Sequence, residues 1–170
     1  MGRSARRSMA TTTALSRRGR INRSLSDLEL RAWQALLHAH EDVVDRLDKD
    51  LRAAYGISFN DYDVLLRLAR ADGHALRMAI LAERVMMPAS SLTRVVDRLV
   101  RRELVGRRRV PADARVMEAY LTQAGRTLLK EAARLHVAGI RQHFTDRLDR
   151  DQLRDLADIL EIIAGPHRPH

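Results

Sequence analysis

The chain has 170 residues, 45% of them hydrophobic, which is enough for one core of ordinary size. It has no cysteine, which excludes disulfide bonds and thiolate chemistry. The net charge of +9 is concentrated: residues 1–23 hold seven arginines and no acid, and residues 94–115 hold eight arginines against three acids. Two basic zones on an otherwise nearly neutral chain indicate a polyanionic partner, nucleic acid above all.

Several classes of protein are not expected. No apolar run approaches the roughly 18 residues of a membrane span, and the N-terminal arginine pairs flank no apolar stretch that resembles a secretory signal. We therefore expect a cytoplasmic protein without a membrane partner. A Gly-rich phosphate loop and a Gly-x-Ser-x-Gly elbow are both missing, which predicts that the chain is no enzyme and needs no cofactor. The histidines have no metal-ligand spacing, so no metal site is expected.

The first elements along the chain are an arm and a long helix. Residues 1–25 are basic and poor in large apolar residues, which predicts an arm without a fold of its own. A capping box, Ser26-Asp-Leu-Glu29, then begins a helix over 26–56 that ends at Gly56. Ser58 begins a second helix, which stops before Asp72.

A fourth helix, after a short third one over 77–85, begins at Pro88 in its first turn. One face carries apolar residues at helical spacing and is predicted to lie in the core: Leu92, Val95, Val96, Leu99 and Val100. The other face is polar and basic. Small polar residues crowd its first turn, where backbone N–H groups and the helix dipole attract phosphate.

Two strand-like runs follow, 103–109 and 116–121, joined by a Pro/Asp turn. A helix with a polar leading turn and an arginine-bearing hairpin behind it is the pattern of a winged helix. We therefore predict a mainly α fold with a small β-hairpin wing, in which a winged helix-turn-helix DNA-binding lobe spans 58–121. The helix is expected in the major groove and the wing against the backbone or the minor groove.

Thr122 is predicted to cap a fifth helix of about 25 residues, and Asp149 begins a sixth. The long helices over 26–56 and 122–164 are amphipathic, and nothing left in the chain covers them. They are predicted to form a helical dimerisation region built from both termini. A single domain would then span 26–164, followed by a tail at 165–170, and the homodimer would read an inverted-repeat operator in double-stranded DNA.

This arrangement resembles the MarR family of bacterial transcription regulators over roughly residues 26–164. The resemblance rests on the segments Phe59–Leu65, Leu81–Arg84, Ser91–Leu99 and Leu104-Val105, and on the wing signature Asp113-x-Arg115 with Leu121-Thr-x-x-Gly125. It implies a dimer, joined through its terminal helices, that usually represses nearby genes and releases DNA on binding a small aromatic or phenolic ligand. One departure is Ala114, where many members carry a second arginine.

The resemblance also implies roles for particular residues. Arg115 would enter the minor groove, with Asp113 orienting its guanidinium, although a plain surface pair of the two is the alternative. The predicted DNA-binding residues are Pro88, Ser90, Ser91, Thr93, Arg94, Arg98, Arg107, Arg109, Asp113 and Arg115. A ligand crevice of the family is expected near Trp33, Leu37, His40 and Tyr62.

Three alternatives stay open at this point. Arg98 and Arg101 are interpreted as phosphate anchors or as partners of Asp97 and Glu103. Arg107, Arg108 and Arg109 alternate along a strand and cannot all face DNA, so one or two of them are interpreted as phosphate contacts and the rest as solvated. A ligand-independent architectural DNA-binding protein has the same electrostatics as a repressor.

Overall fold

A computed structural model describes residues 24–110 and 113–165. The chain divides into two units, residues 1–38 and 39–170, and the first helix runs through the boundary. Nearly all of the predicted arm at 1–25 and of the tail at 165–170 falls outside the described residues. The helices and strands are α1 (Asp27–Tyr55), α2 (Phe59–Arg70), η1 (Asp72–His74), β1 (Ala75–Arg77), α3 (Met78–Arg84), α4 (Ala89–Arg101), β2 (Val105–Val110), β3 (Asp113–Leu121), α5 (Gln123–His143), η2 (Thr145–Arg147) and α6 (Arg150–Ala164).

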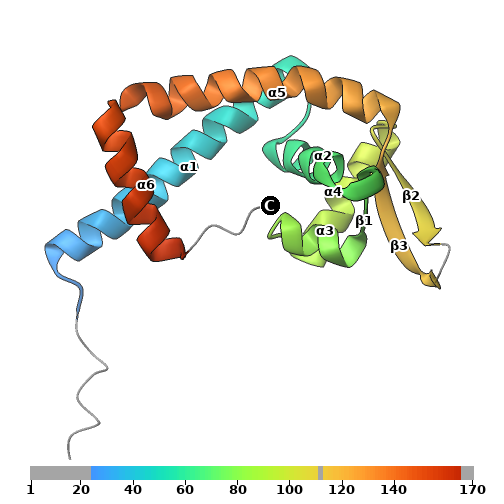
Figure 1. Cartoon of the computed structure of the whole chain (residues 1–170), viewed down its shortest axis with the longest axis horizontal. Coiled ribbons are helices and arrows are strands. Elements are labelled where there is room, and N and C mark those ends of the chain that lie inside the picture. Colours follow the sequence, from blue (N-terminus) through green and yellow to red (C-terminus); the bar gives the residue numbers. More distant parts are fainter. Residues whose placement is uncertain (1–23, 111–112, 166–170) are drawn as a thin grey trace, which may run out of the picture. The chain divides into compact units, whose positions relative to one another are not determined.

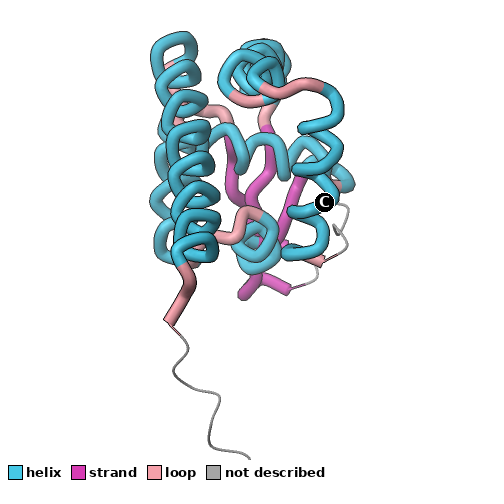
Figure 2. The backbone as a smooth tube through the Cα atoms, turned by 90° about the vertical axis from the view of Figure 1, so that its left-hand side faces the viewer, coloured by secondary structure: helices cyan, strands magenta, loops and turns pink. Residues whose placement is uncertain are grey.

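The predicted hairpin is confirmed, and it belongs to a small antiparallel sheet of order β1-β3-β2 in the described part of the chain. Figure 2 shows these strands side by side. The register pairs Ala75 of β1 with Tyr120 of β3, and Val105 of β2 with Leu121. Strand β1 was not predicted, because a strand of three residues is too short to show an alternating pattern.

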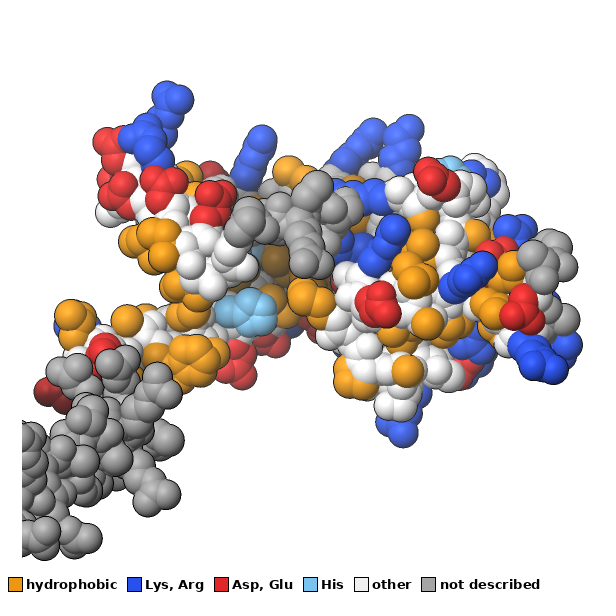
Figure 3. All heavy atoms as spheres, turned by 60° about the horizontal axis from the view of Figure 1, so that its bottom comes forward, with side chains coloured by type: hydrophobic (Ala, Val, Ile, Leu, Met, Phe, Trp, Pro, Cys, Tyr) orange, Lys and Arg blue, Asp and Glu red, His pale blue; other side chains and the backbone are white. Residues whose placement is uncertain are grey.

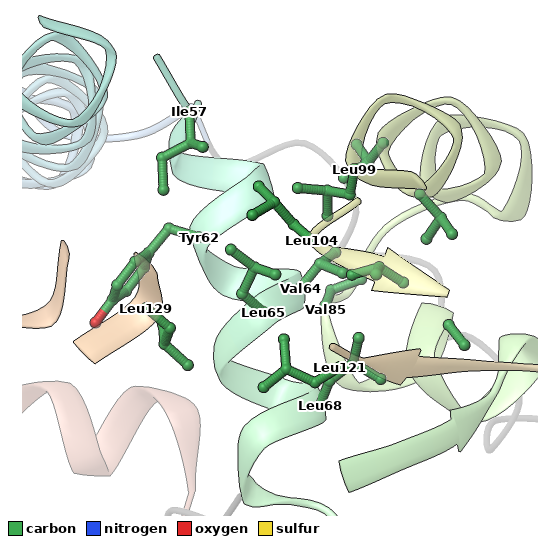
Figure 4. Close-up of a cluster of buried hydrophobic side chains, with 14 of the residues drawn as sticks. Ile57, Tyr62, Val64, Leu65, Leu68, Val85, Leu99, Leu104, Leu121 and Leu129 are labelled. Atoms are coloured by element: carbon green, nitrogen blue, oxygen red, sulfur yellow. The ribbon is translucent and has the colours of Figure 1, made fainter. Parts of the chain in front are cut away.

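The core of residues 39–170 is built around α2. Val64, Leu65 and Leu68 are fully buried, and they pack with apolar side chains from α4, from the sheet and from the turn between α4 and β2. Figure 4 shows Leu99, Leu104 and Leu121 among these partners. Burying such side chains stabilises the fold by roughly 1.5–3 kcal/mol each, so α4 is held firmly along its apolar face.

Side-chain caps begin several helices where the sequence placed them. Ser58 and Asp61 form a complete capping box at α2, and Thr122 accepts a hydrogen bond from the Gly125 N–H at α5. Asp149 caps α6 in the same way. Two details differ from the prediction: Pro88 is the N-cap of α4 rather than its first helical residue, and α5 has 21 residues rather than about 25. The shorter α5 results from the backbone turn at Phe144, after which the chain forms η2.

Among the residues that the structure describes, three other than glycine have a left-handed backbone. His74, Met86 and Glu103 have φ values of 54°, 49° and 59°, and each lies just after a helix or at the end of η1. These turns redirect the chain between the elements of the winged helix. Figure 1 shows the result for residues 39–170, where α2, α3, α4 and the strands gather and α5 leads away from β3 to α6.

Apolar side chains stay exposed on the terminal helices. In residues 24–38, Leu28 is 65% exposed and Trp33 54% exposed. On α6, Ile162 is 83% exposed and Ile163 is 68% exposed. Among the helices that the structure describes, none is long and apolar enough to cross a membrane.

Candidate nucleic-acid interface

Helix α4, which the sequence predicts to be the recognition helix that enters the major groove, divides into a buried and an exposed face as its sequence predicted. Leu92, Val95, Val96 and Leu99 are buried, and Val100 is half-buried. The predicted DNA-binding residues at its start are all exposed: Pro88, Ser90, Ser91, Thr93 and Arg94. The leading turn of α4 therefore presents small side chains and the exposed Arg94 to solvent.

The wing carries the second group of predicted contacts. Arg109, Asp113 and Arg115 are exposed at the far end of the hairpin. Asp113 accepts a hydrogen bond at Oδ1 from the backbone N–H of Arg115, at 2.9 Å. The carboxylate thus fixes the backbone that carries Arg115, whereas the sequence analysis expected it to hold the guanidinium. Figure 3 shows Lys and Arg side chains gathered at this end of residues 39–170.

Arg107 connects the wing to α4. Its Nη1 donates to Asp97 Oδ1 at 2.5 Å, and its Nη2 donates to the carbonyl oxygen of Thr93 at 3.3 Å. Its Nε is buried and has no partner among the described residues. Arg107 was predicted to contact DNA, but in the free protein its guanidinium lies against the recognition helix.

Arg108 points to a different partner, as alternation along a strand requires. It donates to Glu118 of the neighbouring strand, and its guanidinium lies over the Tyr120 ring, 5.1 Å from the centroid. The expectation that Arg107, Arg108 and Arg109 cannot share one surface is therefore confirmed.

Arg98 is joined to α2. Its Nε donates to Asp61 Oδ1 at 3.0 Å, and its Nη2 donates to the same oxygen at 2.6 Å. Asp61 is 2% exposed, so this is a buried carboxylate with a partly exposed arginine. The predicted pairing of Arg98 with Asp97 or Glu103 is wrong, because the acid lies 37 residues away and no local pattern marks it.

Comparison with known proteins decides the family. The sequence model described as the MarR family matches residues 55–116. The crystal structure of AbsC, a MarR family transcriptional regulator from Streptomyces coelicolor, is 34% identical and covers 84% of this chain and 96% of its own, with a TM-score of 0.77. This chain belongs to the MarR family.

Two further relatives agree with the MarR assignment. Sco3205, a MarR family transcriptional regulator from Streptomyces coelicolor solved in complex with DNA, is 32% identical. The match covers 87% of this chain and 92% of that one, with a TM-score of 0.79. The HTH-type transcriptional regulator MhqR of Bacillus subtilis is 27% identical over 116 residues, which is 68% of this chain and 78% of MhqR. The winged helix-turn-helix fold and the regulator class predicted from the sequence are confirmed.

The ligand region predicted from the MarR resemblance is only partly buried. Tyr62 on α2 is 4% exposed, and burial raises the pKa of its hydroxyl. Its ring lies against that of His136 of α5 at an angle of 40°, with 4.4 Å between the centroids, and the Phe59 ring centroid lies 5.8 Å from that of the same histidine. Trp33 and Leu37 are exposed in the first unit, and His40 is exposed in the second.

His136 belongs to this region as well, although it was not predicted from the sequence. Burial lowers the pKa of its imidazole, which favours the neutral ring, and its Nδ1 has no hydrogen-bond partner among residues 24–110 and 113–165. In the sequence it is one histidine within a helical apolar pattern, and that pattern does not distinguish a histidine packed in the core from one that binds a ligand.

Proposed function

We propose that this MarR-family regulator binds double-stranded DNA in a sequence-specific way, as a homodimer on an inverted repeat. The observation that carries the proposal is the exposed leading turn of α4 beside a wing with exposed arginines. A helix of this kind fits the major groove, and an arginine at the tip of a wing suits the narrow, negative minor groove. The DNA complex of Sco3205, a relative at 32% identity, supports the same mode of binding.

The contacts that we propose fall into two groups. Ser90, Ser91, Thr93 and Arg94 on α4, with Pro88 at its start, face the bases and phosphates of the major groove. Arg109 and Arg115 of the wing contact the backbone or the minor groove, with Asp113 bracing the tip. Arg98 and Arg107 were also predicted as contacts, but their guanidinium groups are engaged within the protein.

The homodimer is supported by the exposed apolar side chains of the terminal helices. Ile159, Ile162 and Ile163 lie along α6 and are each more than half exposed in the single chain. Exposed isoleucines at helical spacing are typical of a surface that another chain covers.

The release of DNA by a small aromatic ligand is a further part of the proposal. The buried ring of Tyr62 and the half-buried rings of Phe59 and His136, with an imidazole nitrogen that has no partner among the described residues, offer stacking and one hydrogen bond to such a molecule. A repressor that such a ligand inactivates fits this arrangement and the family resemblance.

Selection from a random-sequence duplex pool tests the DNA-binding proposal. The protein should enrich an inverted repeat whose half-sites lie about one helical turn apart. Sedimentation should show a dimer at micromolar concentration. Enrichment of no sequence, with even binding to all duplexes, would support the architectural alternative instead. A thermal-shift screen of aromatic acids and phenols, repeated as release from the selected duplex, tests the ligand.

A further inference from the structure

We propose that Arg98 and Arg102 clamp the recognition helix to the junction between α1 and α2, and that they position α4 rather than contact DNA. The inference rests on the proposed DNA binding, because the orientation of α4 matters for function only if α4 enters a groove. It assigns Arg98 a role different from the phosphate contact that the sequence suggested.

The first half of the clamp is the ion pair of Arg98 with Asp61. Besides the bonds to Asp61, Arg98 Nη2 donates to Ser58 Oγ at 3.3 Å. Asp61 also accepts hydrogen bonds from the backbone N–H and the hydroxyl of Ser58, both at 2.8 Å. The carboxylate that begins α2 is therefore the same group that holds α4. An arginine whose Nε and Nη2 both bind one carboxylate has its planar group fixed in direction as well as in distance.

The second half is Arg102, the C-cap residue that directly follows α4, four positions after Arg98. Its Nη1 donates to the carbonyl oxygen of Gly56 at 2.7 Å, and its Nη2 donates to that of Tyr55 at 2.9 Å. These carbonyls lie at the end of α1, where helix carbonyls lack partners and the helix dipole attracts a cation. Arg102 thus caps α1 from the recognition helix.

A third contact closes the connection between α1 and α2. Asp48 of α1 accepts a hydrogen bond at Oδ1 from the backbone N–H of Phe59 at 2.7 Å, and Arg52 donates to its Oδ2 at 2.5 Å. The C-terminal part of α1, the start of α2 and the end of α4 are therefore joined by charged hydrogen bonds. A displacement of α1 at this junction must move α4 or break at least one of these bonds.

The position of the clamp explains why it matters for recognition. Arg98 and Arg102 are four residues apart and lie on one face, so two anchors define both the rotation of α4 about its axis and its tilt. Arg94 lies one turn before Arg98 on the same helix. Productive contacts tolerate only about 0.5 Å of misplacement, so loosening the clamp displaces Arg94 from its groove position.

Charge makes the two roles of Arg98 separable by experiment. If Arg98 contacts a phosphate, Arg98→Lys keeps the charge and most of the affinity, and Arg98→Gln lowers the salt slope of log Kd by about 0.9. If Arg98 is a clamp, lysine cannot reproduce the two-pronged pairing with Asp61, and both variants lose affinity with an unchanged slope.

Asp61→Asn is the sharpest test. Removing an acid should strengthen binding to DNA by simple electrostatics, whereas loss of the clamp weakens it.

The experiment measures Kd against salt for the duplex that the wild-type protein selects, at a temperature where circular dichroism shows every variant folded. We expect Asp61→Asn, Arg98→Lys and Arg102→Gln each to weaken binding about tenfold with an unchanged slope. The double variant Asp61→Asn/Arg98→Gln should bind DNA no more weakly than the single variant with the lower affinity, because each substitution removes the same ion pair.

The matched control is the surface pair Asp42 and Arg46, whose arginine is 42% exposed against 43% for Arg98. Asp42→Asn and Arg46→Gln should bind like the wild type.

Three results would overturn the clamp. If the slope of log Kd against log salt concentration is reduced in Arg98→Gln but kept in Arg98→Lys, Arg98 is a phosphate contact. Unchanged affinity in Asp61→Asn with a lowered melting temperature makes the pair merely structural. If the wild type selects no duplex, the proposed function fails, and amide hydrogen exchange of the free protein decides on the clamp. Exchange across Ala89–Arg101 should be faster in Arg98→Lys, and unchanged exchange there rejects the clamp.

Discussion

Arg107 of β2 donates to Asp97 of α4 at 2.5 Å, so the wing is tied to the helix that precedes it. The side chain of Arg107 is 27% exposed and that of Asp97 is 42% exposed. A second bond, from Arg107 to the carbonyl oxygen of Thr93, reaches the turn of α4 that carries Arg94. The two surfaces proposed to meet DNA are thereby held at a fixed separation before DNA is bound.

Breaking this tie should lower the stability of the wing. We expect Arg107→Gln and Asp97→Asn each to reduce the free energy of unfolding by about 0.5–1.5 kcal/mol, since the pair is partly exposed. Urea denaturation of the two single variants and the double variant measures their coupling. Arg109→Gln, an exposed arginine two residues along the same strand, is the control and should leave stability unchanged. If the losses in the free energy of unfolding of the two single variants simply add in the double variant, Arg107 and Asp97 do not stabilise the wing through their ion pair.

Arg94 and Arg115 should affect DNA binding in distinguishable ways. Arg94→Ala should cost about 1–3 kcal/mol and relax the preference at one operator position if it contacts a base. Arg115→Ala should weaken binding and lower the salt slope by about one unit. Binding measured on the selected duplex and on single-base variants separates the two. If both variants bind like the wild type, the proposed interface is wrong.

The sequence predicted most of this fold because its signals are local. Caps at Ser58, Thr122 and Asp149 and the apolar stripe of α4 depend on residues a few positions apart, and these helices were correctly located. The missing parts depend on distant pairs. Arg98 finds Asp61 and Arg102 finds the end of α1 only after the chain has folded, so their roles required the structure. In the sequence, Arg98 and Arg107, which are engaged within the protein, could not be distinguished from the exposed Arg94, Arg109 and Arg115.

Gly125 should not tolerate a side chain. A Cβ placed there would lie 2.1 Å from the carbonyl oxygen of Leu104 and 2.8 Å from Leu121 Cδ1. Because Leu104 contributes backbone, relief requires the start of α5 to move away from the base of the wing. We expect Gly125→Ala to lower the free energy of unfolding by about 1–3 kcal/mol, measured by urea denaturation. Gln123→Ala, an exposed change in the same turn, should have little effect, and equal losses in both would contradict this explanation.

His136 should make stability depend on pH. Burial lowers the pKa of His136 in the folded protein, partly offset by the nearby charge of Asp63, so the unfolded chain binds the proton more readily. This contribution to stability is therefore complete above the unfolded pKa of about 6.5 and is lost as the pH falls below it. His136→Phe keeps a ring between Phe59 and Tyr62 but cannot titrate. Its free energy of unfolding should fall less between pH 7 and pH 5 than that of the wild type, and parallel curves would reject the assignment to His136.

The left-handed backbone at Met86 and Glu103 has a consequence for heat tolerance. A side chain costs about 1–2 kcal/mol in this conformation, and both of these side chains project into solvent. His74 differs, because its ring Nδ1 lies within hydrogen-bond distance of the carbonyl oxygen of Ala69, at 2.9 Å, and this contact offsets part of the conformational strain. The winged helix is therefore less stable than it would be with glycine at these two bends. Glu103→Gly should raise the free energy of unfolding by about 0.5–1 kcal/mol, after allowance for the greater freedom of glycine in the unfolded chain.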